Sequence, residues 1–208
     1  MFRDPFQIIV SLIVAFTALP IHEAAHAFVA SKLGDNTAKH QGRLTINPLV
    51  HLDILGTISL ALFGFGWAKP VPVNPRNFKN PKLGMALSSL AGPVSNILLA
   101  LILLIVYKLL QPVLIFTAYG TTFIYILWIM VQLNIYLAVF NLLPIPPLDG
   151  SRLLTYFLPS KYYFKIMQYE QYIWLILMIV LFTGFLSGPL MWISNKVLHF
   201  LDLITFFI

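Results

Sequence analysis

The chain contains no cysteine among its 208 residues. This absence excludes disulfide bonds, and it excludes any metal or catalytic site that is built on a thiolate. A metal ion would have to be held by histidine, aspartate or glutamate, and the chain has only five histidines and seven acidic residues. The candidates for a metal site are therefore few.

Charge is scarce as well. Charged residues make up 10% of the chain and hydrophobic residues 59%, whereas soluble proteins carry about 25% charged residues. This composition predicts an integral membrane protein with little mass outside the bilayer. The 13 basic residues outnumber the seven acids. In so apolar a chain this excess indicates loops on the cytoplasmic side of the membrane rather than a nucleic-acid partner.

Long apolar runs are the most abundant feature. Four of them are long enough to cross a bilayer, which takes roughly 20 helical residues; they lie at about 6–32, 83–110, 113–143 and 172–193. The run 54–68 is shorter and carries three glycines, which favours a re-entrant or interfacial segment. Residues 37–46 are predicted to form a short strand pair around Gln41 and Gly42.

The expected fold is an all-α polytopic membrane protein. It comprises a three-helix core, one or two further helices and a small membrane-associated β-hairpin or re-entrant segment. The first apolar segment lacks the basic flank and the cleavage site of a signal peptide, so we expect it to be retained. No repeat or long linker divides the chain. We expect one membrane-embedded domain over residues 1–208, with its core at about 6–152 and its C-terminal helices at about 172–208.

The basic residues predict the orientation of these segments. If 54–68 does not cross the membrane, the loops 31–82 and 151–171 lie on one side and hold ten of the 13 basic residues. A crossing at 54–68 would move residues 69–82 to the other side and weaken this bias. The positive-inside rule places these loops in the cytoplasm and the N-terminus outside. The same orientation brings polar residues of the first three segments near the cytoplasmic face.

The first apolar segment contains His22-Glu23-Ala24-Ala25-His26. Two histidines four residues apart lie about one turn apart on one face of a helix, so both can bind one zinc ion. The carboxylate between them can act as the general base that activates a water molecule. A chance match to so short a motif is common in soluble helices. Three costly side chains at bilayer depth need a compensating interaction, however, and zinc supplies it.

Zinc needs a third protein ligand. Asp149 is the first candidate because it follows a proline-rich helix break, where irregular backbone can line a cavity. The alternative is a turn aspartate, since Asp-Gly is a common turn pair. Asp53 is the second candidate, and its neighbour His51 could bind metal or orient substrate. The same two residues also fit an ordinary loop at the start of a helix.

Amides at bilayer depth form a second group of candidates. Asn141 could donate to the scissile carbonyl or its oxyanion, and Asn96 is a possible substrate or secondary-site residue. An interhelical hydrogen bond is the alternative for both. Asn134 is assigned only such a hydrogen bond, and Gly92 and Ser95 only a close approach of two helices.

Three motifs occur in order along the chain: His22-Glu23-x-x-His26, Gly92-Pro93-x-x-Asn96 and Asn141-x-x-Pro144-x-x-Pro147-x-Asp149-Gly150. Together they resemble the site-2 protease family of intramembrane zinc metalloproteases, in its short form without a PDZ domain, over about residues 6–152. The resemblance implies that His22, His26 and Asp149 bind one Zn2+ per chain. It also implies that Glu23 is the catalytic base and that Asn141 helps to hold the substrate carbonyl.

The predicted activity is that of a zinc-dependent endopeptidase. It would hydrolyse peptide bonds in or near transmembrane segments of membrane proteins, in regulated intramembrane proteolysis or in the clearance of membrane fragments. The expected partners are membrane-protein substrate segments and the lipid bilayer, in a bacterial or archaeal cell membrane. The oligomeric state is left open.

Two other functions compete with proteolysis. An ion, proton or metal transporter could use the histidines and acids as a relay, but it would need polar residues across the whole membrane. The half of the first segment before Pro20 has only Gln7, Ser11 and Thr17, which favours a site that ends within the bilayer. A catalytically silent membrane scaffold is the second alternative, and the intact Glu23 argues against it.

Overall fold

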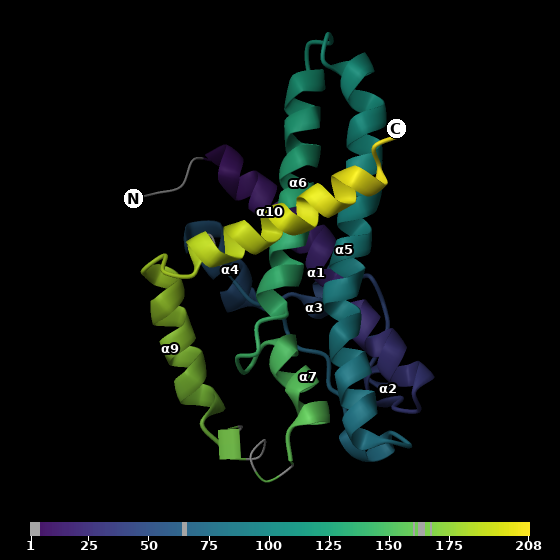
Figure 1. The fold of residues 1–208 in the computed structure, drawn as a ribbon, viewed down its shortest axis with the longest axis vertical. Helices are drawn as coiled ribbons and strands as arrows, with labels where there is room; N and C mark the ends of the chain where they lie inside the picture. Colours follow the sequence, from purple (N-terminus) through teal and green to yellow (C-terminus); the bar gives the residue numbers. More distant parts are fainter. Residues whose placement is uncertain (1–4, 64–65, 160, 162–164, 167) are drawn as a thin grey trace.

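The computed structural model describes residues 5–63, 66–159, 161, 165–166 and 168–208. Three helices in this part of the chain are long and apolar enough to cross a membrane: α1 (Pro5–Lys32), α5 (Pro81–Leu114) and α6 (Gly120–Asn141). Figure 1 shows α5 and α6 side by side, joined by a short connection at the top of the molecule. The predicted helical, multi-span architecture is confirmed at this level.

The helix α5 packs against both α1 and α6. It begins at Asn80, whose side chain accepts a hydrogen bond from the Leu83 N–H at 3.2 Å, and Pro81 follows where no N–H partner is needed. At 1.5 Å per residue α5 is about 50 Å long. Because the hydrocarbon core of a bilayer is only about 30 Å thick, α5 is long enough to extend beyond it.

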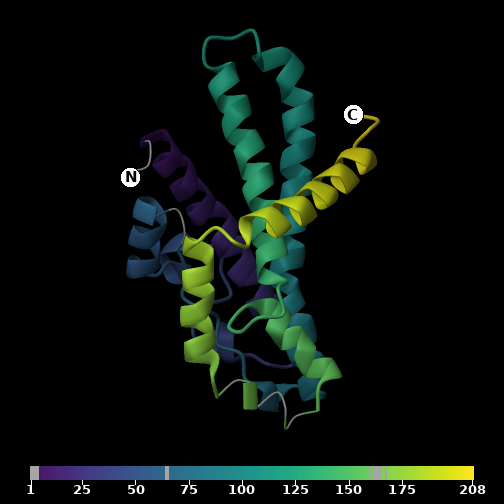
Figure 2. The same cartoon turned by 60° about the vertical axis from the view of Figure 1, so that its left-hand side comes forward.

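The main apolar core lies where α5 and α6 meet the C-terminal helix α10 (Ser187–Ile204). Figure 2 shows α10 crossing α5 and α6. The buried members of this core are Ala100, Leu104, Val131, Ile135, Val139, Leu190 and Leu201. The core fixes α5 and α6 against each other and leaves the first half of α5 to face α1.

The prediction of one helix at about 172–193 is wrong. The chain forms α9 (Glu170–Phe182) and α10, which meet at an angle of 84°. Gly184 lies in the break between them with a φ of +72°, a conformation that glycine adopts at little cost. Taken together as one bent unit, the two helices would be a fourth span.

The predicted strand pair at 37–46 is also wrong, because none of these residues forms a strand. The helix α2 (Thr37–His40) is followed by a turn in which Gly42 has a φ of +67°. The N–H groups of residues 40–43 donate to carbonyls between residues 36 and 39. Because these N–H groups are satisfied locally, they are not available for a strand ladder.

The segment 54–68 returns to the place where it starts, as expected of a re-entrant segment. After α3 (Pro48–His51), α4 (Ile54–Phe63) has ten residues and is about 15 Å long, half the thickness of the hydrocarbon. Beyond it Ala68 pairs with Leu52 in an isolated antiparallel bridge. The Lys69 N–H also donates to the His51 carbonyl at 2.7 Å. The helix α4 is therefore too short to cross the hydrocarbon by itself.

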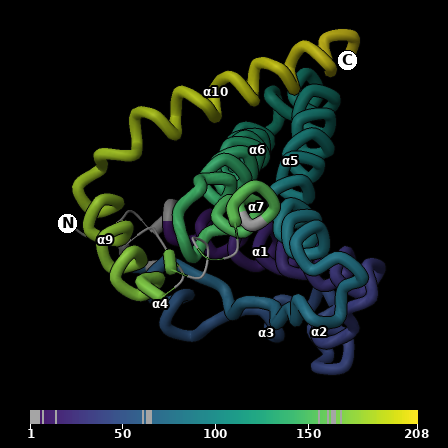
Figure 3. The backbone as a smooth tube through the Cα atoms, turned by 60° about the horizontal axis from the view of Figure 1, so that its bottom comes forward, coloured from purple at the N-terminus to yellow at the C-terminus, as the bar shows by residue number. Residues whose placement is uncertain are grey.

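One end of the molecule gathers short elements from distant parts of the sequence. Figure 3 looks from this end, which carries α2, and shows α7 (Asp149–Phe157) with α5 and α1 beside it. The helix α7 packs against α5, and the 3-10 helix η1 (Pro75–Asn77) packs against α5 as well. Residues of α1, α5 and α7 can therefore meet at this end.

Candidate metal centre

Two helices bring three potential metal ligands together. His22 and His26 lie one turn apart on α1, and Asp149 is the first residue of α7. The His22 Nε2 lies 3.0 Å from the His26 Nε2. The Asp149 Oδ2 lies 3.1 Å from the first of these nitrogens and 3.2 Å from the second. Ligand atoms about 2.0 Å from a tetrahedral zinc ion lie about 3.3 Å apart, so this triangle has the size that zinc requires.

The hydrogen bonds on the far sides of the two rings fix which nitrogen carries the proton. The His26 Nδ1 lies 2.7 Å from the Ser88 carbonyl, which can only accept, so this nitrogen donates. The His22 Nδ1 lies 2.5 Å from the Asn96 Oδ1 and donates in the same way. In the neutral rings both Nε2 atoms therefore present lone pairs to each other and to a carboxylate oxygen. Three acceptors in one buried place need a cation between them, and the site fits zinc.

Gly92 gives the site its room on the side of α5. A Cβ atom at this position would lie 2.4 Å from the His26 Nε2 and 2.5 Å from the His22 Nε2. Cβ atoms essentially never make contacts shorter than 3.0 Å, so a larger residue would have to displace the imidazoles. The close helix approach expected for Gly92 is thus an approach to the metal ligands themselves.

Glu23 is held by the chain segment that covers α1. Its Oε2 accepts a hydrogen bond from the Val71 N–H at 3.0 Å. This segment is fixed in turn by Arg43, a buried residue whose guanidinium donates to the carbonyls of Val50, Lys69 and Pro70. No sequence motif singles out Arg43 or Val71. No local pattern distinguishes a basic residue that binds backbone carbonyls from one that faces solvent.

The other predicted residues have different surroundings. Asn96 contacts His22 directly, as described above, whereas the Asn141 side chain donates to the Leu137 carbonyl of its own helix at 2.9 Å. The His51 ring is fully buried and its Nε2 lies 2.7 Å from the Thr45 carbonyl. Asp53 accepts from the Gly56 N–H at 2.8 Å at the start of α4. Among the described residues, the only group of three potential metal ligands is His22, His26 and Asp149.

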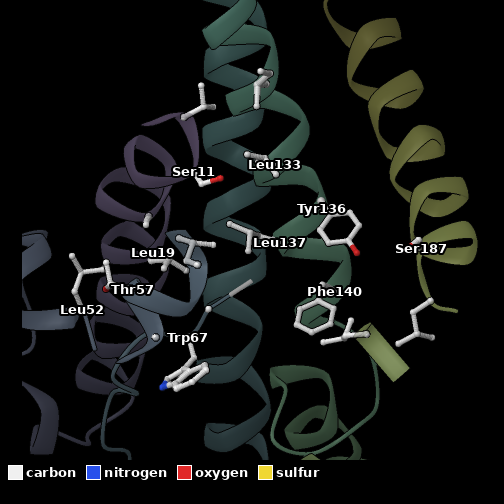
Figure 4. Close-up of a pocket in the computed structure, with 18 of the residues that line it drawn as sticks. Ser11, Leu19, Leu52, Thr57, Trp67, Leu133, Tyr136, Leu137, Phe140 and Ser187 are labelled. Carbon is white, nitrogen blue, oxygen red and sulfur yellow. The ribbon is translucent and has the colours of Figure 1, made fainter. Parts of the chain in front are cut away.

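A cavity of about 560 Å³ lies between α1, α4, α6 and the start of α10. Figure 4 shows Leu19, Trp67, Leu137 and Phe140 among the side chains that line it. The lining is mostly apolar. Leu19 is one helical turn before Glu23 on α1, so the cavity extends along the helix that carries the metal ligands.

Comparisons with known proteins agree with this chemistry. The sequence profile of Peptidase family M50 matches residues 108–184. A Bacillus subtilis protein named as a zinc metalloprotease, YwhC, is 46% identical over 89% of this chain and 84% of its own length. A similarly named protein of Methanocaldococcus jannaschii is 32% identical, with 71% of this chain and 70% of its own length covered.

A third relative, named as the zinc metalloprotease Rip2 of Mycolicibacterium smegmatis, is 29% identical over 89% of this chain and 70% of its own length. No solved structure matches the chain. The identity to YwhC over most of both chains is high enough to establish common descent. The chain therefore belongs to Peptidase family M50, the site-2 protease family, and is a multi-pass membrane metalloprotease with Zn2+ as its cofactor.

Proposed function

We propose that this metalloprotease hydrolyses peptide bonds in or near transmembrane segments of membrane proteins, in signalling by intramembrane proteolysis or in the clearance of membrane fragments. His22, His26 and Asp149 hold the zinc ion. The observation that carries the proposal is the convergence of three acceptor atoms within 3.2 Å of one another, two of them on buried histidines of the apolar helix α1 and one on the partly buried Asp149. Residues 1–208 act as one membrane-embedded unit in this proposal.

Zinc, when bound, polarises the scissile carbonyl and lowers the pKa of water toward neutrality. Glu23 takes the proton from the attacking water and delivers it to the leaving amine. The Val71 N–H holds one carboxylate oxygen of Glu23 and so orients the other for this transfer. Asn141 supports the substrate carbonyl once its amide leaves the Leu137 carbonyl.

The apolar cavity supports a substrate that comes from within the bilayer. A transmembrane helix hides its carbonyls in hydrogen bonds, so it must unwind locally before it can be cleaved. The released side chains are apolar and need an apolar receptor. The cavity between α1 and α6 offers one beside the turn that precedes Glu23.

The test compares two glutamate variants of the full chain in lipid vesicles with a membrane-spanning substrate. Glu23→Gln should retain zinc and lose cleavage by at least about a hundredfold, because general acid–base groups contribute about that much. Glu170→Gln is the matched control, since Glu170 is the other glutamate of the chain and lies at the start of α9. Asp149→Ala should lose zinc itself. Cleavage by Glu23→Gln at the wild-type rate would overturn the proposal.

A transporter and a catalytically silent scaffold predict different results for the same variants. A transporter requires polar groups across the bilayer, but before Pro20 the first segment has only Gln7, Ser11 and Thr17 as polar residues. A scaffold would be indifferent to Glu23→Gln. Wild-type protein that binds zinc and cleaves no membrane-spanning substrate would favour these alternatives.

A further inference from the structure

The metal centre continues beyond its ligands into the α6 helix. We infer that Asn134 is a positioning residue: it fixes the orientation of the Asn96 amide, which in turn keeps His22 in the tautomer whose Nε2 faces the metal. This inference rests on the proposed role of His22 as a zinc ligand. It assigns a role to a residue for which the sequence suggested only contact between helices.

Three side chains form a single line of hydrogen bonds across α1, α5 and α6. The Asn134 Nδ2 donates to the Met130 carbonyl at 2.8 Å. The Asn96 Nδ2 donates to the Asn134 Oδ1 at 2.9 Å. The His22 Nδ1 then donates to the Asn96 Oδ1 at 2.5 Å. Every donor in the line points the same way.

The backbone carbonyl at the end of the line sets this direction. The Met130 carbonyl can only accept, so the amide nitrogen of Asn134 must face it and its oxygen must face Asn96. That oxygen can only accept, so Asn96 must turn its nitrogen to it and its oxygen to His22. A flip of either amide would bring two acceptors or two donors face to face.

Burial prevents either asparagine amide from flipping without losing its hydrogen bonds. Asn96 and Asn134 are both completely buried, and no water at bilayer depth can replace a lost partner. His26 needs no such line, because its Nδ1 meets the Ser88 carbonyl directly. The two ligands therefore differ, and only His22 depends on side chains for the nitrogen that it offers to the metal.

The experiment measures zinc affinity of the purified full chain by competition with a chelator, and the absorption spectrum of the Co2+ form. Asn134→Leu removes the acceptor that Asn96 needs, so zinc affinity should fall about tenfold, the lower end of the range for outer partners of metal ligands. The Co2+ spectrum should change as well. Gln132→Leu is the matched control, because Gln132 is an exposed amide on the same helix, and it should leave both readouts unchanged.

Two further variants separate positioning from helix packing. The protonated carboxyl of Asn134→Asp offers the same donor and acceptor as the amide, so this variant should restore the affinity. In an Asn96→Leu background the link from Asn134 to His22 is already absent, so Asn134→Leu should have little further effect on the affinity. Where the leucine variant does not fold, Asn134→Ala takes its place.

Each result bears on the inference in one direction. Loss in Asn134→Leu, recovery in Asn134→Asp and a smaller effect beside Asn96→Leu support it. Equal affinities for Asn134→Leu and Gln132→Leu overturn it, as does the same loss in both Asn96 backgrounds. Wild-type chain that binds no zinc, or a His22→Ala variant that binds it normally, overturns the proposed ligand set as well, so the two failures can be told apart.

Discussion

At the scale of single residues, the metal centre depends on backbone groups as much as on its ligands. The Ser88 carbonyl orients His26 and the Val71 N–H orients Glu23. Gly92 contributes by having no side chain. The Ser88 carbonyl survives every substitution, whereas Gly92 and Asn96 on α5 support the site through their side-chain positions and can be tested directly.

Gly92→Ala should disrupt zinc binding. The added methyl group would lie 2.4–2.5 Å from the Nε2 atoms of His22 and His26, so both imidazoles would have to move. We expect zinc affinity to fall at least about tenfold, as measured by chelator competition. Gly188→Ala on α10 is the control, because a Cβ atom there meets nothing within 4 Å. Equal affinities in the two variants would show that the ligands adjust without cost.

At the scale of elements, sequence periodicity and chemistry predict the helices and the ligand set. They do not predict the segment 69–71, which covers the site next to Glu23 and is called the cover below. His22, His26 and Asp149 could be selected because costly side chains in apolar segments stand out. The strand pair at 37–46 is a wrong prediction because the N–H groups of α2 and its turn are satisfied by local hydrogen bonds. Such local bonds leave no pattern in the sequence. The break at Gly184 was missed because hydropathy averages over a window and does not report φ.

The cover, residues 69–71, is held in place by the buried side chain of Arg43. Arg43 binds the carbonyls of Val50, Lys69 and Pro70, and the next residue, Val71, binds Glu23. A lysine has one ammonium group and cannot reproduce this fork. Arg43→Lys should therefore lower kcat about 10- to 100-fold by displacing the base, while zinc content stays unchanged.

The control for this variant is Arg76→Lys, because Arg76 is exposed on η1. Cleavage rates and zinc content are measured side by side for the two variants and the wild type. Loss of zinc in Arg43→Lys would mean that the cover supports the ligands rather than the base. An unchanged kcat would mean that the segment 69–71 does not depend on the guanidinium.

The loop after α1 contains a second buried anchor, Asp35. Its carboxylate accepts hydrogen bonds from the N–H and hydroxyl of Thr37, the Asn74 N–H and the Asn77 amide. Burial by itself raises the pKa of Asp35, but these hydrogen bonds outweigh it and hold the pKa below its ordinary value. The carboxylate thus ties the end of α1 to the segment before α5.

This lowered pKa gives the fold an acid-sensitive contribution. Because the native pKa lies below the unfolded value of about 4, the stabilisation is complete above about pH 4 and is lost as the pH falls through the native pKa. Asp35→Asn should lower the unfolding temperature at neutral pH and flatten its decline between about pH 5 and pH 3. Thermal unfolding in detergent measures both effects. Asp202→Asn, at a 56% exposed carboxylate, is the control.

At the scale of the whole molecule, the polar groups collect at one end. Figure 1 shows α2 and α7 at the bottom, opposite the connection between α5 and α6. The stretches 31–82 and 151–171, which include α2, η1 and most of α7, carry ten of the 13 basic residues. At the other end, Lys108 pairs with Asp202 of α10 at 2.8 Å. This segregation supports an active site near the cytoplasmic face.

The absence of cysteine makes this orientation testable, because each introduced thiol is the only one in the chain. His40→Cys, Lys79→Cys and Ala118→Cys place single thiols at exposed positions before the re-entrant segment, after it and between α5 and α6. In membrane vesicles of known orientation, a membrane-impermeant maleimide should label the first two from the cytoplasmic side and the third from the opposite side. Labelling of His40→Cys and Lys79→Cys from different sides would mean that 54–68 crosses the bilayer. Labelling of both from outside would move the active site to the other face.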